Sequence, residues 1–181
     1  MKKLVLIFVI ITAIILVFVT LIIFESLIPM PMGIRHYIHF FFPSKDLNIP
    51  LLLDELFLPT KEGFSKEYLL NLKYLDFYEL GFQSSKGNIP SSYSFGGSIK
   101  VQFFNKGKLI SEHFVSTIQR MTAHGRDINH IDEFTLLDVR LDERYKGDLK
   151  IRLTVLKPDL QLSQYSDSLN LYLKVSAYPA P

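Results

Sequence analysis

An uninterrupted apolar run near the N-terminus limits the structure of this chain more than any other feature. Leu4–Phe24 holds 18 Leu, Ile, Val or Phe residues in 21 positions and carries no charge. A helix of this length is about 32 Å long, close to the roughly 30 Å hydrocarbon core of a bilayer. In lipid an unpaired strand would leave its backbone groups without hydrogen bonds, so the segment must be helical there. We therefore predict a transmembrane helix whose partner, over Leu4–Phe24, is the lipid bilayer.

The charges on either side of this run predict its orientation. Lys2 and Lys3 precede it, whereas Glu25 is the first charge after it. The positive-inside rule then places the short N-terminus in the cytoplasm and residues 25–181 across the membrane. The alternative is a cleaved signal peptide, whose apolar region is usually shorter, at about 7–15 residues, and ends in a small-residue cleavage site. Because the run has no such site after it, we expect residues 1–25 to remain as a cytoplasmic tip and transmembrane signal anchor.

The composition of the chain narrows the classes of function. The formal net charge is only +2 and no cluster of Lys or Arg occurs beyond the N-terminal pair, so we expect no nucleic-acid partner. The lack of cysteine excludes disulfide bonds, thiolate metal ligands and a cysteine nucleophile. The part of the chain beyond the apolar run is long enough for one domain with a packed core.

Prolines mark the segment between the anchor and this domain. Residues 26–50 contain four of them, and each blocks regular hydrogen-bonded structure nearby. Between these prolines, Gly33–Phe42 is rich in aromatic residues. We interpret it either as a segment at the level of the lipid headgroups or as a first irregular strand of the domain. Residues 26–50 are thus a predicted linker, and residues 51–181 a predicted extracytoplasmic domain.

From residue 51 onward, apolar and polar residues alternate as in strands with one buried face. Asp148–Leu156 and Leu169–Val175 show the pattern without interruption. Ser98–Phe104 and Leu109–Ser116 flank the turn Asn105–Lys108, which predicts a β-hairpin with a left-handed glycine. Further strands are expected at Leu51–Leu58, Glu67–Leu72, Phe77–Gln83 and Phe134–Leu141.

Two details complete the predicted fold. The doubled Leu136-Leu137 indicates a bulge or burial on both faces of its strand, and Ser116–Met121 is expected to form a short helix. Seven to eight short strands separated by turns are typical of a mainly β domain, and we predict an antiparallel β-sandwich.

Functional motifs of the catalytic and metal-binding classes are missing from the chain, so we predict no catalytic residue, metal ligand or cofactor. Two polar segments are candidate partner-binding elements, Ser84–Gly97, which we predict to be a long exposed loop, and Thr117–Asp132. The second loop is interpreted either as a recognition loop or weak cation site, or as a polar crossover whose Asp127 caps a turn and whose Arg126 pairs with an acid. The candidate partner-binding residues in the two loops are Tyr93, Phe95, His124, Arg126, Asp127 and His130.

Three stretches of the second half carry a resemblance to a known family: EYLLNLKYLDFYELGF (Glu67–Phe82), HGRD (His124–Asp127) and FTLLDVRLDERYKGDLKIRLTVLKPD (Phe134–Asp159). They resemble a family of uncharacterised bacterial envelope proteins, membrane-anchored or lipidated, with one β-sandwich domain. The resemblance covers about residues 64–177 and implies no active site. Some family members are encoded beside antibacterial effectors such as type VI lipases, which implies an immunity role for those members.

These features are compatible with three hypotheses of function. The first is a non-enzymatic binding domain held on the periplasmic side of a bacterial inner membrane, in its specific form an immunity protein that neutralises a periplasm-acting toxin. The second is a structural or assembly subunit of a cell-envelope complex. The third is a hydrolase, which the absence of a nucleophile, base and metal constellation disfavours.

Overall fold

The computed structural model describes residues 2–23, 49–54, 59, 61–123, 129–165 and 168–176. The chain divides into two compact units, Met1–Phe42 and Pro43–Pro181. The predicted linker therefore lies almost entirely outside the described residues.

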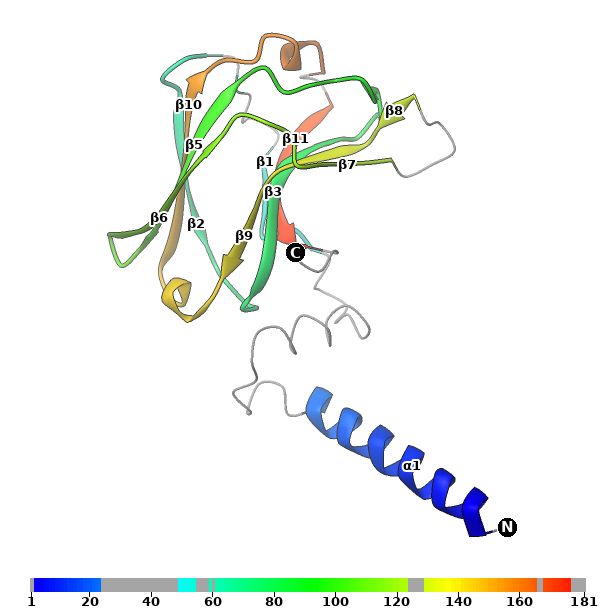
Figure 1. The fold of residues 1–181 in the computed structure, drawn as a ribbon. Coiled ribbons are helices and arrows are strands. Elements are labelled where there is room, and N and C mark those ends of the chain that lie inside the picture. Colours follow the sequence, from blue (N-terminus) through cyan, green and yellow to red (C-terminus); the bar gives the residue numbers. More distant parts are fainter. Residues whose placement is uncertain are drawn as a thin grey trace. The chain divides into compact units, whose positions relative to one another are not determined.

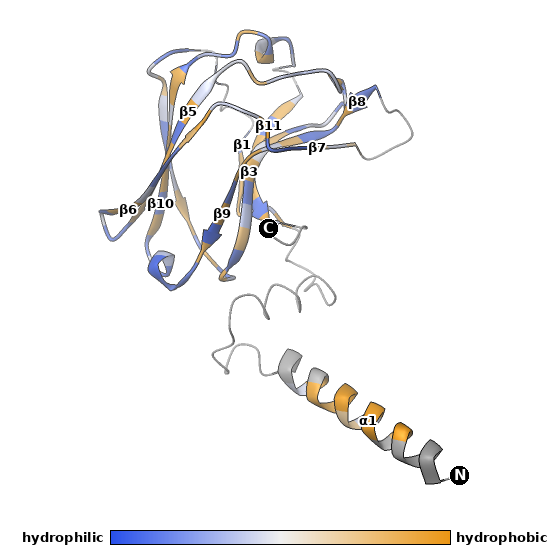
Figure 2. Cartoon of the chain, viewed as in Figure 1, coloured by the Kyte–Doolittle hydropathy of each residue, from blue (hydrophilic) through white to orange (hydrophobic). Residues whose placement is uncertain are grey.

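In the first unit, helix α1 spans Lys2–Ile23 (Figure 1). Its described apolar side chains are exposed. Figure 2, which colours the backbone by residue hydropathy, shows hydrophobic residues along much of the helix. Thr12 and Thr20 donate their hydroxyls to the carbonyls of Phe8 and Leu16 at 2.9 and 2.8 Å, so these polar side chains are satisfied within the helix. Across the described residues, no helix is both long enough and apolar enough to cross a membrane. The helix itself is confirmed, and its role as a transmembrane anchor stays a prediction.

The second unit contains two antiparallel sheets that face each other (Figure 1). The five-stranded sheet has the order β1 (Leu52–Asp54), β11 (Leu169–Val175), β3 (Asp76–Ser84), β9 (Glu133–Leu141), β7 (Arg120–Thr122). The four-stranded sheet has the order β2 (Ser65–Leu70), β10 (Leu149–Lys157), β5 (Ser98–Asn105), β6 (Lys108–Val115). A ribbon of β4 (Ile89–Pro90) and β8 (His130–Ile131) and two short 3-10 helices, η1 (Glu143–Tyr145) and η2 (Leu162–Tyr165), complete the unit. The predicted mainly β, antiparallel architecture is confirmed.

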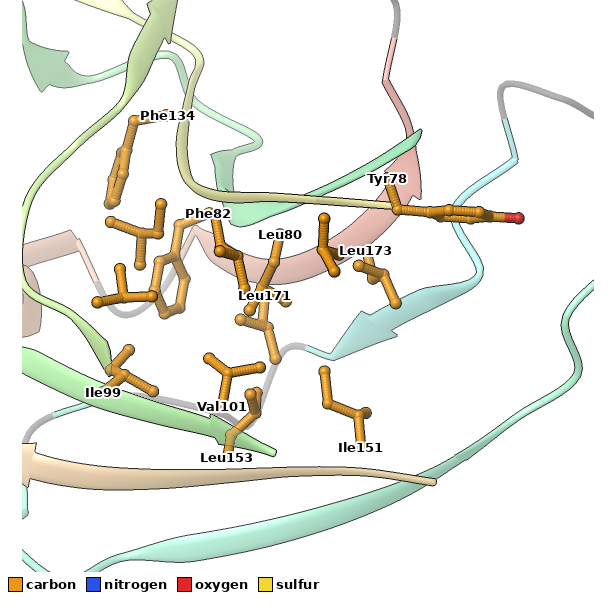
Figure 3. Close-up of a cluster of buried hydrophobic side chains, with 14 of the residues drawn as sticks. Tyr78, Leu80, Phe82, Ile99, Val101, Phe134, Ile151, Leu153, Leu171 and Leu173 are labelled. Carbon is orange, nitrogen blue, oxygen red and sulfur yellow. The ribbon is translucent and has the colours of Figure 1, made fainter. Parts of the chain in front are cut away.

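Alternate residues of the long strands form the core between the sheets (Figure 3). On β10, the four inward side chains are fully buried, as the alternation predicted: Leu149, Ile151, Leu153 and Val155. They meet inward residues of the other sheet, including Tyr78, Leu80, Phe82, Leu171 and Leu173. Each fully buried aliphatic or aromatic side chain contributes roughly 1.5–3 kcal/mol, so this double layer stabilises the domain.

Contacts at the sheet edges also join the two sheets. Asp54 on β1 accepts hydrogen bonds from Lys66, at 2.7 Å, and from the Tyr68 hydroxyl, both on β2. Because β1 and β2 are edge strands of different sheets, this trio connects the two layers at one side.

The structure confirms two local predictions in β5, β6 and β9. The β5–β6 hairpin turns at Lys106 and Gly107, which both have positive φ, 50° and 77°, as a two-residue turn of the primed type requires. On β9, Leu137 pairs with Leu80 while Thr135 pairs with Gly81, so Leu136 is the extra residue of a bulge. Both leucines are buried, as predicted.

Two other local predictions are wrong. Residues 116–121 form no helix, because Arg120–Thr122 is strand β7 and the Gln119 amide donates to the Thr135 carbonyl at 2.8 Å. Main-chain pairing with β9 outweighs the local helical pattern there. Residues 84–97 are not simply an exposed loop, since they include strand β4 and two buried aromatic residues.

Candidate functional site

Of the six partner-binding residues predicted from the sequence, the structure describes three, Tyr93, Phe95 and His130. His124, Arg126 and Asp127 lie outside the described residues. His130 is exposed on β8. Tyr93 and Phe95 are each only 6% exposed, so their side chains belong to the core rather than to an exposed contact surface.

Burial of the loop that carries Tyr93 has a clear local cause. One oxygen of the buried Asp159 carboxylate accepts the Tyr93 hydroxyl at 2.6 Å and the Gly96 amide at 2.9 Å. The other oxygen accepts the amides of Gln161 and Leu162 at 2.9 and 3.2 Å, at the start of η2. Burial and the hydrogen bond to Asp159 raise the pKa of Tyr93. Asp159 thus holds two separate loops together, and its role is structural.

The outer face of the five-stranded sheet carries a self-contained ionic cluster, defined as Glu79, Arg120, Glu133, Asp138 and Lys174. Glu79 is 2% exposed and lies 3.4 Å from both Arg120 and Lys174. Arg120 also pairs with both Asp138 oxygens at 2.8 and 2.9 Å. Lys174 pairs with Glu133 at 2.7 Å. Each cation therefore bridges Glu79 and a second carboxylate.

Burial of Glu79 in this cluster disfavours its charged form. Desolvation raises the pKa of Glu79, although Lys174 and Arg120 act in the opposite direction. Nearby, the Tyr172 hydroxyl lies 3.2 Å from the Thr135 hydroxyl, and burial raises the pKa of Tyr172. The charged groups of this cluster are thus paired with one another. Among the described residues, no group of three or more His, Asp or Glu side chains is placed to hold a metal ion.

The outer face of the four-stranded sheet has a different character, and we call it the open face. Strand register places twelve outward residues in three rows across β2, β10, β5 and β6. The rows are Leu69–Lys150–Phe104–Leu109, Glu67–Arg152–Gln102–Glu112 and Ser65–Thr154–Lys100–Phe114. Neighbours in a row lie on adjacent strands, with their side chains on the same face of the sheet.

Large apolar side chains of the open face remain exposed. Leu69 is 77% exposed, Phe114 66% and Leu109 45%. Surfaces with several such residues beside ordered polar groups are typical of protein-interaction sites. On the outer face of the five-stranded sheet, the described residues include one such side chain, Leu53, which pairs with Tyr172 and is 51% exposed.

The middle row of the open face is an ordered polar strip between the two apolar-containing rows. Glu67 accepts Arg152 Nε at 2.6 Å and lies 2.9 Å from Lys150 Nζ, and these hydrogen bonds lower the pKa of Glu67. Gln102 donates to Glu112 at 2.6 Å. The Arg152 guanidinium also lies 4.9 Å from the centre of the Phe104 ring. The strip is therefore arranged before any partner binds.

The open face was not predicted from the sequence, although the sequence contains a signal for it. The alternation within Asp148–Leu156 places Lys150, Arg152 and Thr154 on the solvent side, and the signal consists of outward residues on neighbouring strands that break this polar pattern. Leu69 and Phe114 do so. Only strand pairing shows that such residues share one face.

Comparisons with known proteins add little to this description. No protein-family model matches the sequence, and no curated protein matches it. A crystal structure of a protein from Sulfurospirillum deleyianum is similar over 66% of this chain and 94% of its own length, at 12% identity and a TM-score of 0.44. A likeness this distant carries no argument about function.

Proposed function

We propose that this chain is a membrane-anchored binding protein whose β-sandwich domain docks a protein partner on the open face. One observation carries the proposal: Leu69, Phe104, Leu109 and Phe114 flank an ordered polar strip on one outer face. The outer face of the other sheet satisfies its own charges. Aromatic and apolar anchors around ordered hydrogen-bonding groups are the usual composition of protein interfaces.

Membrane attachment in this proposal rests on the chemistry of the N-terminal segment. Leu4–Phe24 carries no charge, Lys2 and Lys3 precede it, and the described side chains of α1 are exposed. Exposed apolar surface of this extent is unfavourable in water and favourable in lipid. The proposed location of the domain is the periplasmic side of a bacterial inner membrane.

In its specific form, the proposal is an immunity protein that neutralises a periplasm-acting toxin such as a type VI lipase. An anchor concentrates an inhibitor at the membrane surface, where an enzyme that attacks lipids acts. The alternative is a structural or assembly subunit of an envelope complex, which the same surface would serve. The neighbouring open reading frame separates the two, because a lipase or peptidoglycan hydrolase there favours immunity, whereas secretion or pilus genes favour assembly.

The test uses the full chain in nanodiscs and the protein encoded by the neighbouring open reading frame as its probe. We expect Leu69→Ala and Phe114→Ala each to weaken binding by about 30-fold or more, as loss of an interface hot spot does. Stability should change little, because both side chains are exposed. Leu160→Ala is the matched control, because Leu160 is 70% exposed but lies outside the open face. Equal binding by all three variants and the unmodified chain would refute the open face as the docking surface.

A second readout separates the two forms of the proposal. Cells that export the neighbouring protein to the periplasm should survive only with the full chain, and Phe114→Ala should reduce that protection while Leu160→Ala retains it. Tight binding without any protection would favour the assembly role.

A further inference from the structure

We propose that the end of the domain at which the chain enters β1 binds an anionic lipid surface. This basal end consists of residues 49–51, 71–75, 105–108 and 142–148. The inference rests on the proposed membrane anchor and concerns a surface that shares only Leu109 with the open face.

Strand register determines which loops share the basal end in the five-stranded sheet. Leu52 pairs with Leu173, so the start of β1 lies beside the end of β11. Val175 pairs with Tyr78, and Asp76 pairs with Leu141, which adds the start of β3 and the end of β9. The chain therefore enters the domain beside the segments 71–75 and 142–148.

The β5–β6 hairpin belongs to the same end of the domain. Leu149 of β10 pairs with both Leu70 and Asn105, so the end of β2 and the hairpin turn lie side by side. The Asn105 side-chain amide donates to the carbonyls of Arg144 and Lys146 at 2.7 and 3.0 Å. The Lys106 amide lies 3.4 Å from the Asp148 carbonyl. These bonds fix the hairpin against η1.

The basal end carries an excess of positive charge. It has five cations: Lys73, Lys106, Lys108, Arg144 and Lys146. It has three carboxylates, Asp142, Glu143 and Asp148, of which Asp142 lies 2.9 Å from Arg144 and Glu143 lies 3.8 Å from Lys146. Lys106 and Lys108 are exposed and have no ion-pair partner among the described residues. The hairpin turn therefore presents two ammonium groups that the described part of the chain leaves unpaired.

Apolar side chains accompany these lysines. Leu109 comes directly after Lys108 and is 45% exposed, and Lys73 lies 5.3 Å from the centre of the Tyr74 ring. Lysines next to leucine and tyrosine suit the headgroup level of an anionic bilayer, where cations meet phosphates and apolar groups meet acyl chains. Because such attraction fades within about 8–10 Å at physiological salt, the domain must already be near the membrane. An anchor connected at the same end of the domain supplies that proximity.

The absence of cysteine allows a direct test on the full chain. Single-cysteine variants Asn71→Cys, at the basal end, and Ser92→Cys, at the opposite end, are labelled with a polarity-sensitive fluorophore; both positions are exposed. The labelled chains are reconstituted into phosphatidylcholine vesicles with or without phosphatidylglycerol and with a spin-labelled quencher lipid. We expect a blue shift and quenching at position 71 in anionic vesicles, weakened by salt, and neither change at position 92.

Reversing the charge of two lysines, at the basal end or elsewhere on the domain, tests whether the hairpin lysines are needed for docking. Lys106→Glu with Lys108→Glu should lower the ratio of docked to undocked domain at least 25-fold, because each lysine near an anionic surface contributes about fivefold. Lys61→Glu with Lys157→Glu makes the same charge change at exposed positions away from the basal end and should leave docking unchanged.

Three results would overturn the inference. The first is a chain that resists carbonate extraction while its position-71 label reports no lipid, which refutes basal docking and leaves the anchor standing. Second, an equal effect of both lysine pairs would show non-specific attraction. Third, a silent label combined with loss of partner binding in the Lys106 and Lys108 variant would assign the lysines to the protein partner. A chain that carbonate extracts would instead refute the anchor, and with it basal docking and the membrane attachment of the proposed function, but not partner binding on the open face.

Discussion

Replacing Asp159 by alanine should be one of the most damaging single substitutions in the domain. The carboxylate accepts four hydrogen bonds, from the Tyr93 hydroxyl and from the amides of Gly96, Gln161 and Leu162. The bonds to Tyr93 and Leu162 are buried, so alanine would leave two buried donors without an acceptor. Each such donor costs about 1–3 kcal/mol, which gives roughly 4 kcal/mol for the pair.

This loss is large for a domain of this size. Free energies of unfolding are typically about 5–15 kcal/mol, so Asp159→Ala should remove a substantial fraction. With an unfolding entropy of about 2.1 cal/mol/K per residue, we expect the midpoint of thermal unfolding to fall by about 12–15 °C. The measurement is thermal and urea unfolding of the full chain in mild detergent, monitored by circular dichroism.

Two further variants divide the effect of Asp159 between its oxygens. Tyr93→Phe removes one donor and should cost only about 1–1.5 kcal/mol. Asp159→Asn retains one acceptor oxygen at the start of η2 but presents an amide nitrogen to Tyr93 and Gly96, so it should fall between the other two variants. A loss below about 1 kcal/mol in Asp159→Ala would refute the reasoning, because the loops would then be held by apolar packing alone.

Other substitutions test the local geometry. Gly81→Ala should cost about 3 kcal/mol, measured by urea unfolding, because its Cβ would lie 2.1 Å from the Phe134 carbonyl oxygen and 2.8 Å from the Tyr172 hydroxyl; unchanged stability would show that the bulge relaxes freely. Burial raises the pKa of the Glu79 carboxyl, so this group stays protonated to higher pH in the folded state than in the unfolded state. As the pH rises from the ordinary pKa of glutamate through the raised pKa of Glu79, the free energy of unfolding should therefore fall. Glu79→Gln should lack that decline in unfolding experiments from about pH 4 to pH 8, and an identical decline would assign it to other groups. Gly107→Ala should lower stability by about 1 kcal/mol in thermal unfolding, since φ is +77° there with no atom within 4 Å, and an unchanged midpoint would show that the turn tolerates a side chain.

Local patterns predicted much of the fold, because they depend on neighbouring residues. The period of two identified the buried side chains of β10, and the Asn-Lys-Gly-Lys turn predicted the hairpin. The uncharged run Leu4–Phe24 determined by itself that the first element is a helix. These features require no knowledge of what lies elsewhere in the chain.

The candidate site was not predictable in this way. Tyr93 is buried because its hydroxyl meets Asp159, 66 residues further along, and β7 forms because β9 offers a strand to pair with. Likewise, Leu69 and Phe114 share the open face only because β2, β10, β5 and β6 are neighbours in that order. The two-residue alternation of side chains along a strand predicts which of its residues share a face. The order and register of the strands, by contrast, depend on contacts between residues far apart in the chain. The sequence by itself therefore determined the N-terminal helix, the long alternating strands and their buried faces. The tertiary structure alone decided the short strand β7 and which outward side chains form a common surface.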